Sequence, residues 1–248
     1  MIKTQGIILS EIRFKESSKI LNVYTKKLGK ISLMAQGAYK PKSHLLAATQ
    51  PFANVEFQLR TGRNFYYISG ADLINSFYSI RGDLERLAYG FYLLELLEKS
   101  TPDEEQNEKL FLLLEKGLGY LSGIDKDYLK FIVAYELKYI SFIGYKPHLE
   151  NCVVCNKKLE GKVKFSTILG GVLGFCCIYN DITAKNINNS VLSSMNKLLY
   201  STFEELASLN INKNILNSIH DIIVDYILNC IERREFKSLS LVKTLIGP

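Results

Sequence analysis

The sequence predicts an α+β protein in which a small antiparallel barrel of five strands precedes a helical domain that carries an inserted cysteine segment. Three observations support this prediction. Short apolar runs separated by turn residues fill the start of the chain, apolar residues then recur at helical spacing, and four of the five cysteines lie close together. The expected domains are a barrel over residues 1–79 and a helical domain over residues 80–248, with residues 148–181 as the cysteine segment.

Five segments near the N-terminus have the composition of strands. Residues 53–59 alternate apolar and polar side chains with period two, and residues 61–64 match a hairpin turn. Five short antiparallel strands fit an oligonucleotide-binding barrel (OB-fold), and an SH3-like barrel fits the same pattern nearly as well. The expected strands are residues 6–9, 19–25, 29–36, 53–59 and 65–68.

Helical periodicity begins near residue 80, where leucines recur every three or four positions. Asp103 is an N-cap candidate for a second helix that continues through Leu118. Residues 128–143 form a third amphipathic segment, which Gly144 and Pro147 end. The stripes of leucine and aromatic residues are expected to face the core, and two further helices are expected over residues 191–206 and 215–233.

Charge is unevenly distributed along the chain. Residues 1–63 hold 11 Lys and Arg against 3 Asp and Glu, a net charge of +8. The remaining residues hold 20 against 22, a net charge of −2. A basic module joined to a mildly acidic body indicates contact with a polyanion, although a solvated basic surface explains the charge equally well.

The sequence gives no sign of export or of a membrane span. The N-terminus lacks a signal peptide's apolar stretch, and the longest weakly polar run, residues 168–179, is shorter than the ~20 residues that cross a bilayer. We therefore expect a cytoplasmic, nucleoid-associated protein. In a reducing compartment, clustered cysteines favour a metal site or chance over a disulfide framework.

Catalytic motifs are missing from the sequence. It contains no P-loop and no dinucleotide glycine fingerprint, and the three histidines, His44, His148 and His220, lie in no nucleophile or metal-hydrolase motif. A metal-dependent hydrolase is disfavoured because no catalytic Glu or Asp pattern accompanies the cysteines. The expected protein is therefore not an enzyme.

The basic module supplies candidate nucleic-acid contacts. On a small barrel, a nucleic-acid strand lies along turns and one sheet face, where cations neutralise phosphates and rings stack on bases. Tyr66 is the ring expected to point outward, because Phe65 and Tyr67 share the opposite face. The other candidate contacts are Lys26, Lys27, Lys30, Lys40, Lys42, Arg60 and Arg63.

The cysteine segment contains one good half of a zinc site. Structural zinc takes four ligands, usually as two close pairs, and Cys152 with Cys155 makes one such pair. Cys176 and Cys177 are adjacent, so both bind one ion only if the loop is distorted. The sequence leaves open a four-cysteine site, a three-cysteine site completed by His148 or water, and no site at all.

Four motifs in order resemble the bacterial RecO family of DNA repair and recombination proteins. The first is an N-terminal stretch that includes Gly29, Lys30 and a Gln-Pro-Phe at residues 50–52, and the second is a Gly-x-x-Pro turn before the first cysteine pair. The third is a Phe-Ser and Gly-Gly segment before the second pair, and the fourth is a Lys-Ser-Leu ending at residues 237–239. The resemblance covers nearly the whole chain and implies an OB-fold at its start.

This sequence departs from the family's metal-binding pattern at one position. Family members that carry zinc read Gly-Gly-x-x-Cys-x-x-Cys, whereas here Gly174 stands at the first cysteine position and Cys177 at the second. Cys176 is displaced and is a substitute candidate for the missing ligand. Some relatives lack the metal, so the resemblance implies one structural zinc without requiring it.

The resemblance also implies a function and partners. Such proteins bind single- and double-stranded DNA through the barrel, anneal complementary strands, and help RecA load onto DNA that single-stranded DNA-binding protein covers. Their partners are the acidic tail of that protein and the ring-forming RecR. The alternative is an RNA-binding or ribosome-associated barrel protein with a zinc knuckle, which the relative affinity for single-stranded DNA and RNA would separate.

Overall fold

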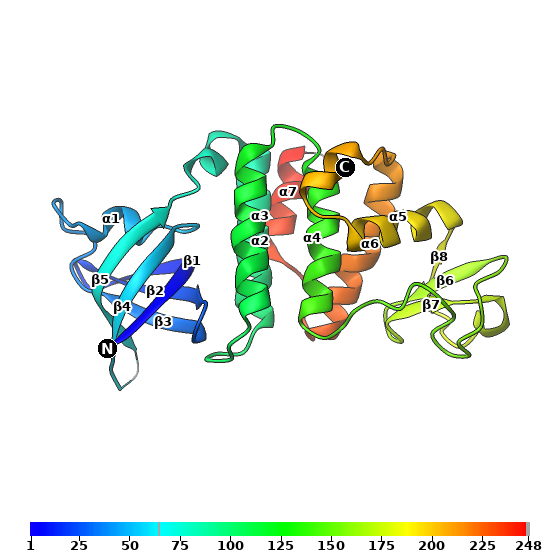
Figure 1. Ribbon diagram of the computed structural model, residues 1–248, viewed down its shortest axis with the longest axis horizontal. Helices are drawn as coiled ribbons and strands as arrows, with labels where there is room; N and C mark the ends of the chain where they lie inside the picture. The colour runs from blue at the N-terminus through cyan, green and yellow to red at the C-terminus, as the bar shows by residue number, and fades with distance from the viewer. Residues whose placement is uncertain (64, 247–248) are drawn as a thin grey trace. The chain divides into compact units, whose positions relative to one another are not determined.

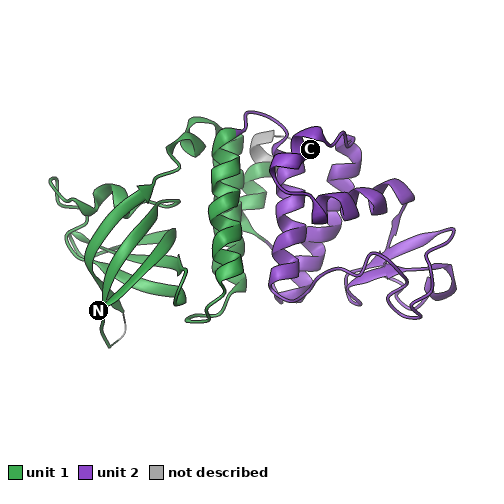
Figure 2. Cartoon of the chain, viewed as in Figure 1, with its two compact units in different colours: residues 1–123, 236–248 green, residues 124–235 purple. Residues whose placement is uncertain are grey.

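The computed structural model describes residues 1–63 and 65–246 of the chain. It divides into two compact units, one of residues 1–123 with 236–248 and one of residues 124–235 (Figure 2). The first unit therefore contains the predicted barrel together with the helices that follow it and the last helix of the chain. The predicted boundary between a domain of residues 1–79 and one of residues 80–248 remains a prediction.

The N-terminal part of the first unit is a closed five-stranded barrel, as the sequence predicts (Figure 1). The strands are ordered β1-β2-β3-β5-β4 and pair antiparallel, except that β3 and β5 run parallel. A short helix, α1, lies between β3 and β4, as an OB-fold requires. The elements are β1 (Ile2–Phe14), β2 (Ser18–Thr25), β3 (Gly29–Ala35), α1 (Leu45–Ala48), β4 (Asn54–Thr61) and β5 (Tyr66–Asn75).

Alternating apolar side chains fill the barrel. On β3, Ile31, Leu33 and Ala35 belong to the barrel core, while the residues between them face the other way. Gly6 permits a close approach of strands, because a Cβ there would lie 2.7 Å from the Val23 Cγ1 atom. All five predicted strands are present, and β1 and β5 extend further than the alternation indicated.

Three helices complete the first unit. Helix α2 (Leu84–Ser100) begins at Asp83, whose side chain accepts a hydrogen bond from the Arg86 amide. Helix α3 (Glu108–Gly123) begins after Asn107, which accepts from the Leu110 amide over 3.2 Å. The prediction that Asp103 caps this helix is wrong, because Asp103 lies before the helix and pairs with Lys30 at 3.3 Å. Helix α7 (Lys237–Ile246) packs on α2.

The start of α7 is fixed by a single carboxylate. Both Glu95 oxygens accept backbone amides, from Lys237 at 3.1 Å and from Ser238 at 2.8 Å. A carboxylate at a helix N-terminus satisfies unpaired amides and interacts favourably with the helix dipole. This contact joins the end of the chain to the middle of α2.

The second unit is a helical core with a small sheet. Its helices are α4 (Tyr128–Phe142), α5 (Asn189–Tyr200) and α6 (Lys213–Cys230), which pack on one another through buried aromatic and aliphatic side chains. Phe131 packs edge-on against Phe203, with ring centroids 5.1 Å apart. The predicted helices over these ranges are confirmed, although α5 ends at Tyr200 and a short 3₁₀ helix, Glu204–Ser208, follows it. Among the described helices, none has the length and apolar character needed to cross a membrane.

The cysteine segment folds as a small module of the second unit. Strands β6 (Val163–Ser166), β7 (Gly171–Leu173) and β8 (Lys185–Ile187) form an antiparallel sheet in the order β7-β6-β8 (Figure 1). One of its buried clusters consists of Cys152, Leu173, Cys177 and Ala184, and Phe165 of β6 packs against Tyr226 of α6. We refer to residues 148–187 as the cysteine module.

Candidate functional site

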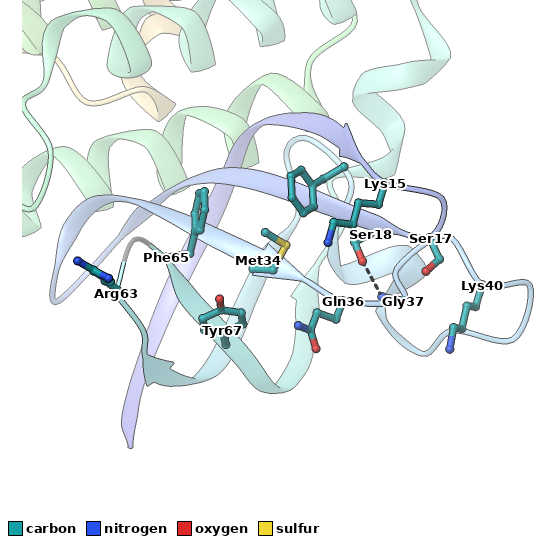
Figure 3. Close-up of a pocket in the computed structure, with 11 residues that line it drawn as sticks. Lys15, Ser17, Ser18, Met34, Gln36, Gly37, Lys40, Arg63, Phe65 and Tyr67 are labelled. Atoms are coloured by element: carbon teal, nitrogen blue, oxygen red, sulfur yellow. Dashed lines mark hydrogen bonds between the residues drawn. The ribbon is translucent and has the colours of Figure 1, made fainter.

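One face of the barrel carries a hollow of about 610 Å³ (Figure 3). It combines cationic side chains with aromatic rings on a concave surface, which is the composition that binds single-stranded nucleic acid. We call it the barrel hollow. Its lining residues are Phe14, Lys15, Ser17, Ser18, Met34, Gln36, Gly37, Lys40, Arg63, Phe65 and Tyr67.

The barrel hollow lies where an OB-fold binds its ligands. One wall is the β1–β2 turn around Lys15, another is the β4–β5 loop that bears Arg63, and the floor includes Met34 from β3. Oligonucleotides bind OB-folds on the face of the second and third strands, between these same two loops. The position of the hollow in the fold thus agrees with its composition.

The aromatic residues that line the barrel hollow differ from the prediction at one position. Tyr66 was expected to point outward, but it packs against the barrel core and its hydroxyl donates to Glu104 over 3.1 Å. The cause is its pairing with Leu33 on β3, because paired residues share a face and Leu33 is fully buried. Tyr67, which pairs with Met34, lines the hollow together with Phe65.

Three cations line the barrel hollow: Lys15, Lys40 and Arg63. Within the described residues, none of them forms an ion pair, so their charges are available to phosphates. Two predicted cations extend this surface. Arg60 pairs across the strands with Tyr67 and therefore shares its face, and exposed Lys42 lies two residues beyond Lys40.

A buried lysine holds the loop that carries Lys40 and Lys42. Lys19 is fully buried and forms an ion pair with Glu11. Its ammonium also donates to the Thr49 carbonyl over 3.4 Å and lies 4.7 Å from the centre of the Tyr39 ring. The loop is further attached to the β1–β2 turn by the Tyr39 amide, which donates to the Ser17 carbonyl. The loop that carries Lys40 and the turn that carries Lys15 are thereby connected.

The remaining predicted lysines do not reach the barrel hollow. Lys26 pairs with Glu108 at 3.2 Å, and Lys27 donates to the Lys3 carbonyl over 2.7 Å. Lys30 donates to the carbonyls of Glu98 and Thr101 over 2.9 and 2.6 Å, and so caps the C-terminus of α2. Lys26 and Lys27 lie in the β2–β3 turn, at the end of β2 away from Ser18, and Lys30 follows at the start of β3.

Lys15, Phe65 and Tyr67 line the barrel hollow but are absent from the contacts predicted from the sequence. Lys15 occupies the β1–β2 turn with a positive φ of 55°, a conformation that non-glycine residues adopt rarely. The signal available in the sequence was the position of the loop, since Lys15 lies between the first two predicted strands, residues 6–9 and 19–25, and the corresponding OB-fold loop contacts ligands.

In the cysteine module, the sulfur atoms of Cys152, Cys155 and Cys177 lie within 4.8 Å of one another. Burial opposes ionisation of Cys152, but the backbone amides of Cys155, Gly174 and Val154 donate to its sulfur and lower its pKa to about 6. Amides that point at a thiolate in this way are suited to a metal-bound sulfur, which carries negative charge. Burial and the neighbouring thiols raise the pKa of Cys177 to about 12, so three thiolates require a cation.

The predicted fourth ligand, Cys176, lies at the edge of this cluster. Its sulfur is 3.3 Å from that of Cys155 and 3.7 Å from that of Cys177, although it is not part of the group within 4.8 Å. Zn–S bonds of about 2.3 Å in a tetrahedron separate sulfurs by about 3.8 Å. The three-cysteine set fits a divalent metal such as zinc, and exposed Cys176 lies beside two of its three sulfurs.

His148 takes part in the module through its backbone. Its amide donates to the Gly170 carbonyl and its carbonyl accepts the Val172 amide, both over 2.9 Å. The side chain is exposed and does not belong to the sulfur cluster. Among the alternatives that the sequence left open, the described residues favour a cysteine site over completion by His148.

The fold and the barrel hollow define the class of the protein: an OB-fold protein whose ligand face is suited to nucleic acid. Comparison with known proteins gives the family. The model of the recombination protein O N terminus matches residues 1–77, and that of its C terminus matches residues 81–240. The chain belongs to the RecO family of DNA repair proteins.

Individual relatives cover nearly the full chain. The DNA repair protein RecO of Alkaliphilus metalliredigens is 34% identical over 245 residues, which are 99% of this chain and 100% of that protein. That of Acetivibrio thermocellus is 31% identical, over 98% of this chain and 97% of its own. That of Pelotomaculum thermopropionicum is 35% identical, over 94% of this chain and 90% of its own.

Proposed function

We propose that this protein is a non-catalytic recombination mediator that binds single- and double-stranded DNA through the barrel hollow and anneals complementary strands. The observation that carries the proposal is the barrel hollow itself, in which Lys15, Lys40 and Arg63 lie beside the rings of Phe65 and Tyr67. Cations without ion-pair partners supply affinity for any phosphate backbone, and rings stack on any base. Such a surface binds without sequence preference, as a mediator of strand pairing needs.

Annealing at such a site requires no nucleotide hydrolysis. A strand that lies across the barrel hollow has its phosphates partly neutralised, which lowers its repulsion of a complementary strand. The free energy then comes from base pairing. The residues proposed to contact DNA are Lys15, Lys40, Lys42, Arg60, Arg63, Phe65 and Tyr67.

We propose that the rest of the chain serves partners, in line with the division into residues 1–79 and 80–248. The partners are the acidic tail of single-stranded DNA-binding protein and RecR, and together they allow RecA to load onto the exposed strand. Helical surfaces with apolar grooves suit peptide partners of this kind. One structural zinc held by Cys152, Cys155 and Cys177, with Cys176 as a fourth ligand, would fix the cysteine module.

Strand annealing tests the proposal directly. Fluorescence transfer between two complementary labelled oligonucleotides gives the annealing rate with and without protein, and a single-stranded RNA of the same sequence gives the DNA preference. We expect acceleration by the wild type, and its loss in a Lys40→Glu, Arg63→Glu variant. Lys26→Glu is the matched control, because Lys26 lies at the other end of β2 and pairs with Glu108.

The outcomes separate the alternatives. If Lys26→Glu and the Lys40→Glu, Arg63→Glu variant slow annealing equally, bulk charge and not the barrel hollow is responsible. If the wild type prefers RNA and does not anneal DNA, the ribosome-associated alternative replaces the mediator.

A further inference from the structure

The cysteine module exposes aromatic side chains that its core does not use. Phe175 is 69% exposed and Tyr179 is 86% exposed, although both flank the buried Cys177. Val154, at the tip of the first cysteine pair, is also exposed. Exposure of two rings in one short segment is costly in water, so it indicates a surface that contacts something.

The segment that bears these rings is held in place. The Cys177 amide donates to the Gly174 carbonyl over 2.9 Å, and the Asn180 amide donates to the Cys177 carbonyl over 3.0 Å. The next residue, Asp181, is buried and accepts from the Ser166 hydroxyl over 2.6 Å. Phe175 and Tyr179 therefore project from a fixed backbone, and ordering them on a ligand costs little entropy.

Two lysines belong to the loop that packs against the residue before Phe175. Gly174, which precedes Phe175, is in contact distance of the first cysteine turn, because a Cβ there would be 3.5 Å from the Cys152 Cβ atom and 3.7 Å from the Leu159 Cδ2 atom. Lys157 and Lys158 directly precede Leu159 and are exposed. Within the described residues, neither lysine forms an ion pair.

The local charge favours an anionic ligand. Residues 154–164 hold four lysines and one acid, Glu160, a net charge of +3 in a domain that is otherwise mildly acidic. A protein partner with an apolar surface would need no such charge. Lysines beside exposed rings are the combination that binds single-stranded nucleic acid, since phosphates pair with the cations and bases stack on the rings.

We infer that the cysteine module is a second binding surface for single-stranded nucleic acid. Phe175 and Tyr179 stack on bases, and Lys157 and Lys158 contact the phosphates between them. This inference rests on the proposed function and deepens it. A chain with one strand-binding surface on the barrel and another on the cysteine module holds two strands at once, which an annealing protein that acts alone would need.

The test uses a full-length variant in which the barrel hollow is disabled by Lys40→Glu and Arg63→Glu. We expect this variant to retain weakened binding of a fluorescent oligo-dT, measured by anisotropy. Adding Phe175→Ala and Tyr179→Ala should weaken the residual binding at least fivefold for each ring, in line with stacking on bases, which is worth ~1–3 kcal/mol per base. Ultraviolet crosslinking of oligo-dT should place adducts on the peptide that contains residues 175–179.

Tyr78→Ala is the matched control, because Tyr78 is 77% exposed and belongs to the other compact unit. It should leave the residual binding unchanged, and circular dichroism should show that the exposed-ring variants remain folded. Residual binding that is insensitive to the two rings, or crosslinks confined to residues 63–67, would overturn the inference. Binding that persists in full after the barrel substitutions but disappears with the rings would refute the proposed function and support the inference. A wild type that binds no single strand would refute both.

Discussion

The barrel and the cysteine module are stabilised in different ways. The barrel core contains thirteen buried residues from β1 to β4 and the adjoining segments, with partly buried residues of β5 packed against them. The cluster around the sulfurs of the cysteine module contains four buried residues, of which two are cysteines. A core of the first kind supports a fold by apolar burial alone, while a core of the second kind is too small to do so. The comparison teaches that the face of the barrel hollow should be independent of metal, whereas the part of the cysteine module around the sulfurs should depend on it.

The largest expected effect comes from replacing a cysteine of the sulfur cluster, which tests whether the cysteine module depends on metal while the barrel does not. Cys152→Ser removes a proposed metal ligand whose sulfur accepts three backbone amides, and it should abolish metal binding and local order in the module. We expect about one zinc per chain in the wild type and none in the variant, measured by mass spectrometry of the purified protein. Amide exchange should become fast over residues 148–187 and stay slow in the barrel.

The matched control is Cys230→Ser, which lies on α6 outside the sulfur cluster and should retain the metal. A wild type without zinc, or a Cys152→Ser variant with unchanged exchange in the module, would show that packing alone holds the cysteines.

A second substitution separates stability from DNA binding within the first unit. Lys30→Met removes the ammonium that caps the last carbonyls of α2 and leaves them without this partner. The free energy of unfolding of this unit should fall by about 1–3 kcal/mol, with no change in DNA affinity. Urea unfolding and anisotropy measure the two quantities.

Lys40→Met is the comparison variant and should show the reverse pattern, weaker DNA binding at unchanged stability. If Lys30→Met weakens DNA binding as much as Lys40→Met does, the assignment of Lys30 to stability is wrong.

The smallest expected effect concerns Asp181 in the cysteine module. Hydrogen bonds from Ser166 and Thr183 lower the pKa of Asp181 in the folded state. A lowered folded pKa stabilises the module fully above the unfolded value of about 3.9, and the stabilisation is lost as the pH falls through the folded value. Asp181→Asn should therefore reduce stability by about 1 kcal/mol, equally from pH 5 to pH 8.

Thermal melts at pH 5 and pH 8 measure this difference. Glu160→Gln is the control, because Glu160 is exposed in the same module. A difference between wild type and Asp181→Asn that changes sign or doubles across this range would contradict the account.

The sequence predicts local structure better than it predicts which residues meet. The five strands and the main helices follow from the period of their apolar residues, which local chemistry controls. Tyr66 was assigned to the outer face because alternation alone does not give the absolute face of a strand. Its pairing with Leu33 of β3, far away in sequence, decides that face.

The same limit applies to the cations and cysteines. From the sequence alone, Lys30 is a plausible DNA contact. Only the position of α2 shows that its ammonium donates to the carbonyls of Glu98 and Thr101. The first cysteine pair was predictable from its spacing. The placement of Cys177 inside the cluster and Cys176 at its edge depends on the 3₁₀ turn Phe175–Cys177, which spacing does not specify.

The central claim is that the barrel hollow binds the DNA backbone through cations that form no ion pair within the described residues. Its most direct test is the salt dependence of oligo-dT affinity for the wild type and for Lys40→Glu, measured by anisotropy from 50 to 300 mM NaCl. Each phosphate contact contributes about −0.7 to the slope of log K against log salt for a single strand. We predict a shallower slope for Lys40→Glu and an unchanged slope for Lys26→Glu, whereas equal slopes for all three proteins would contradict the claim.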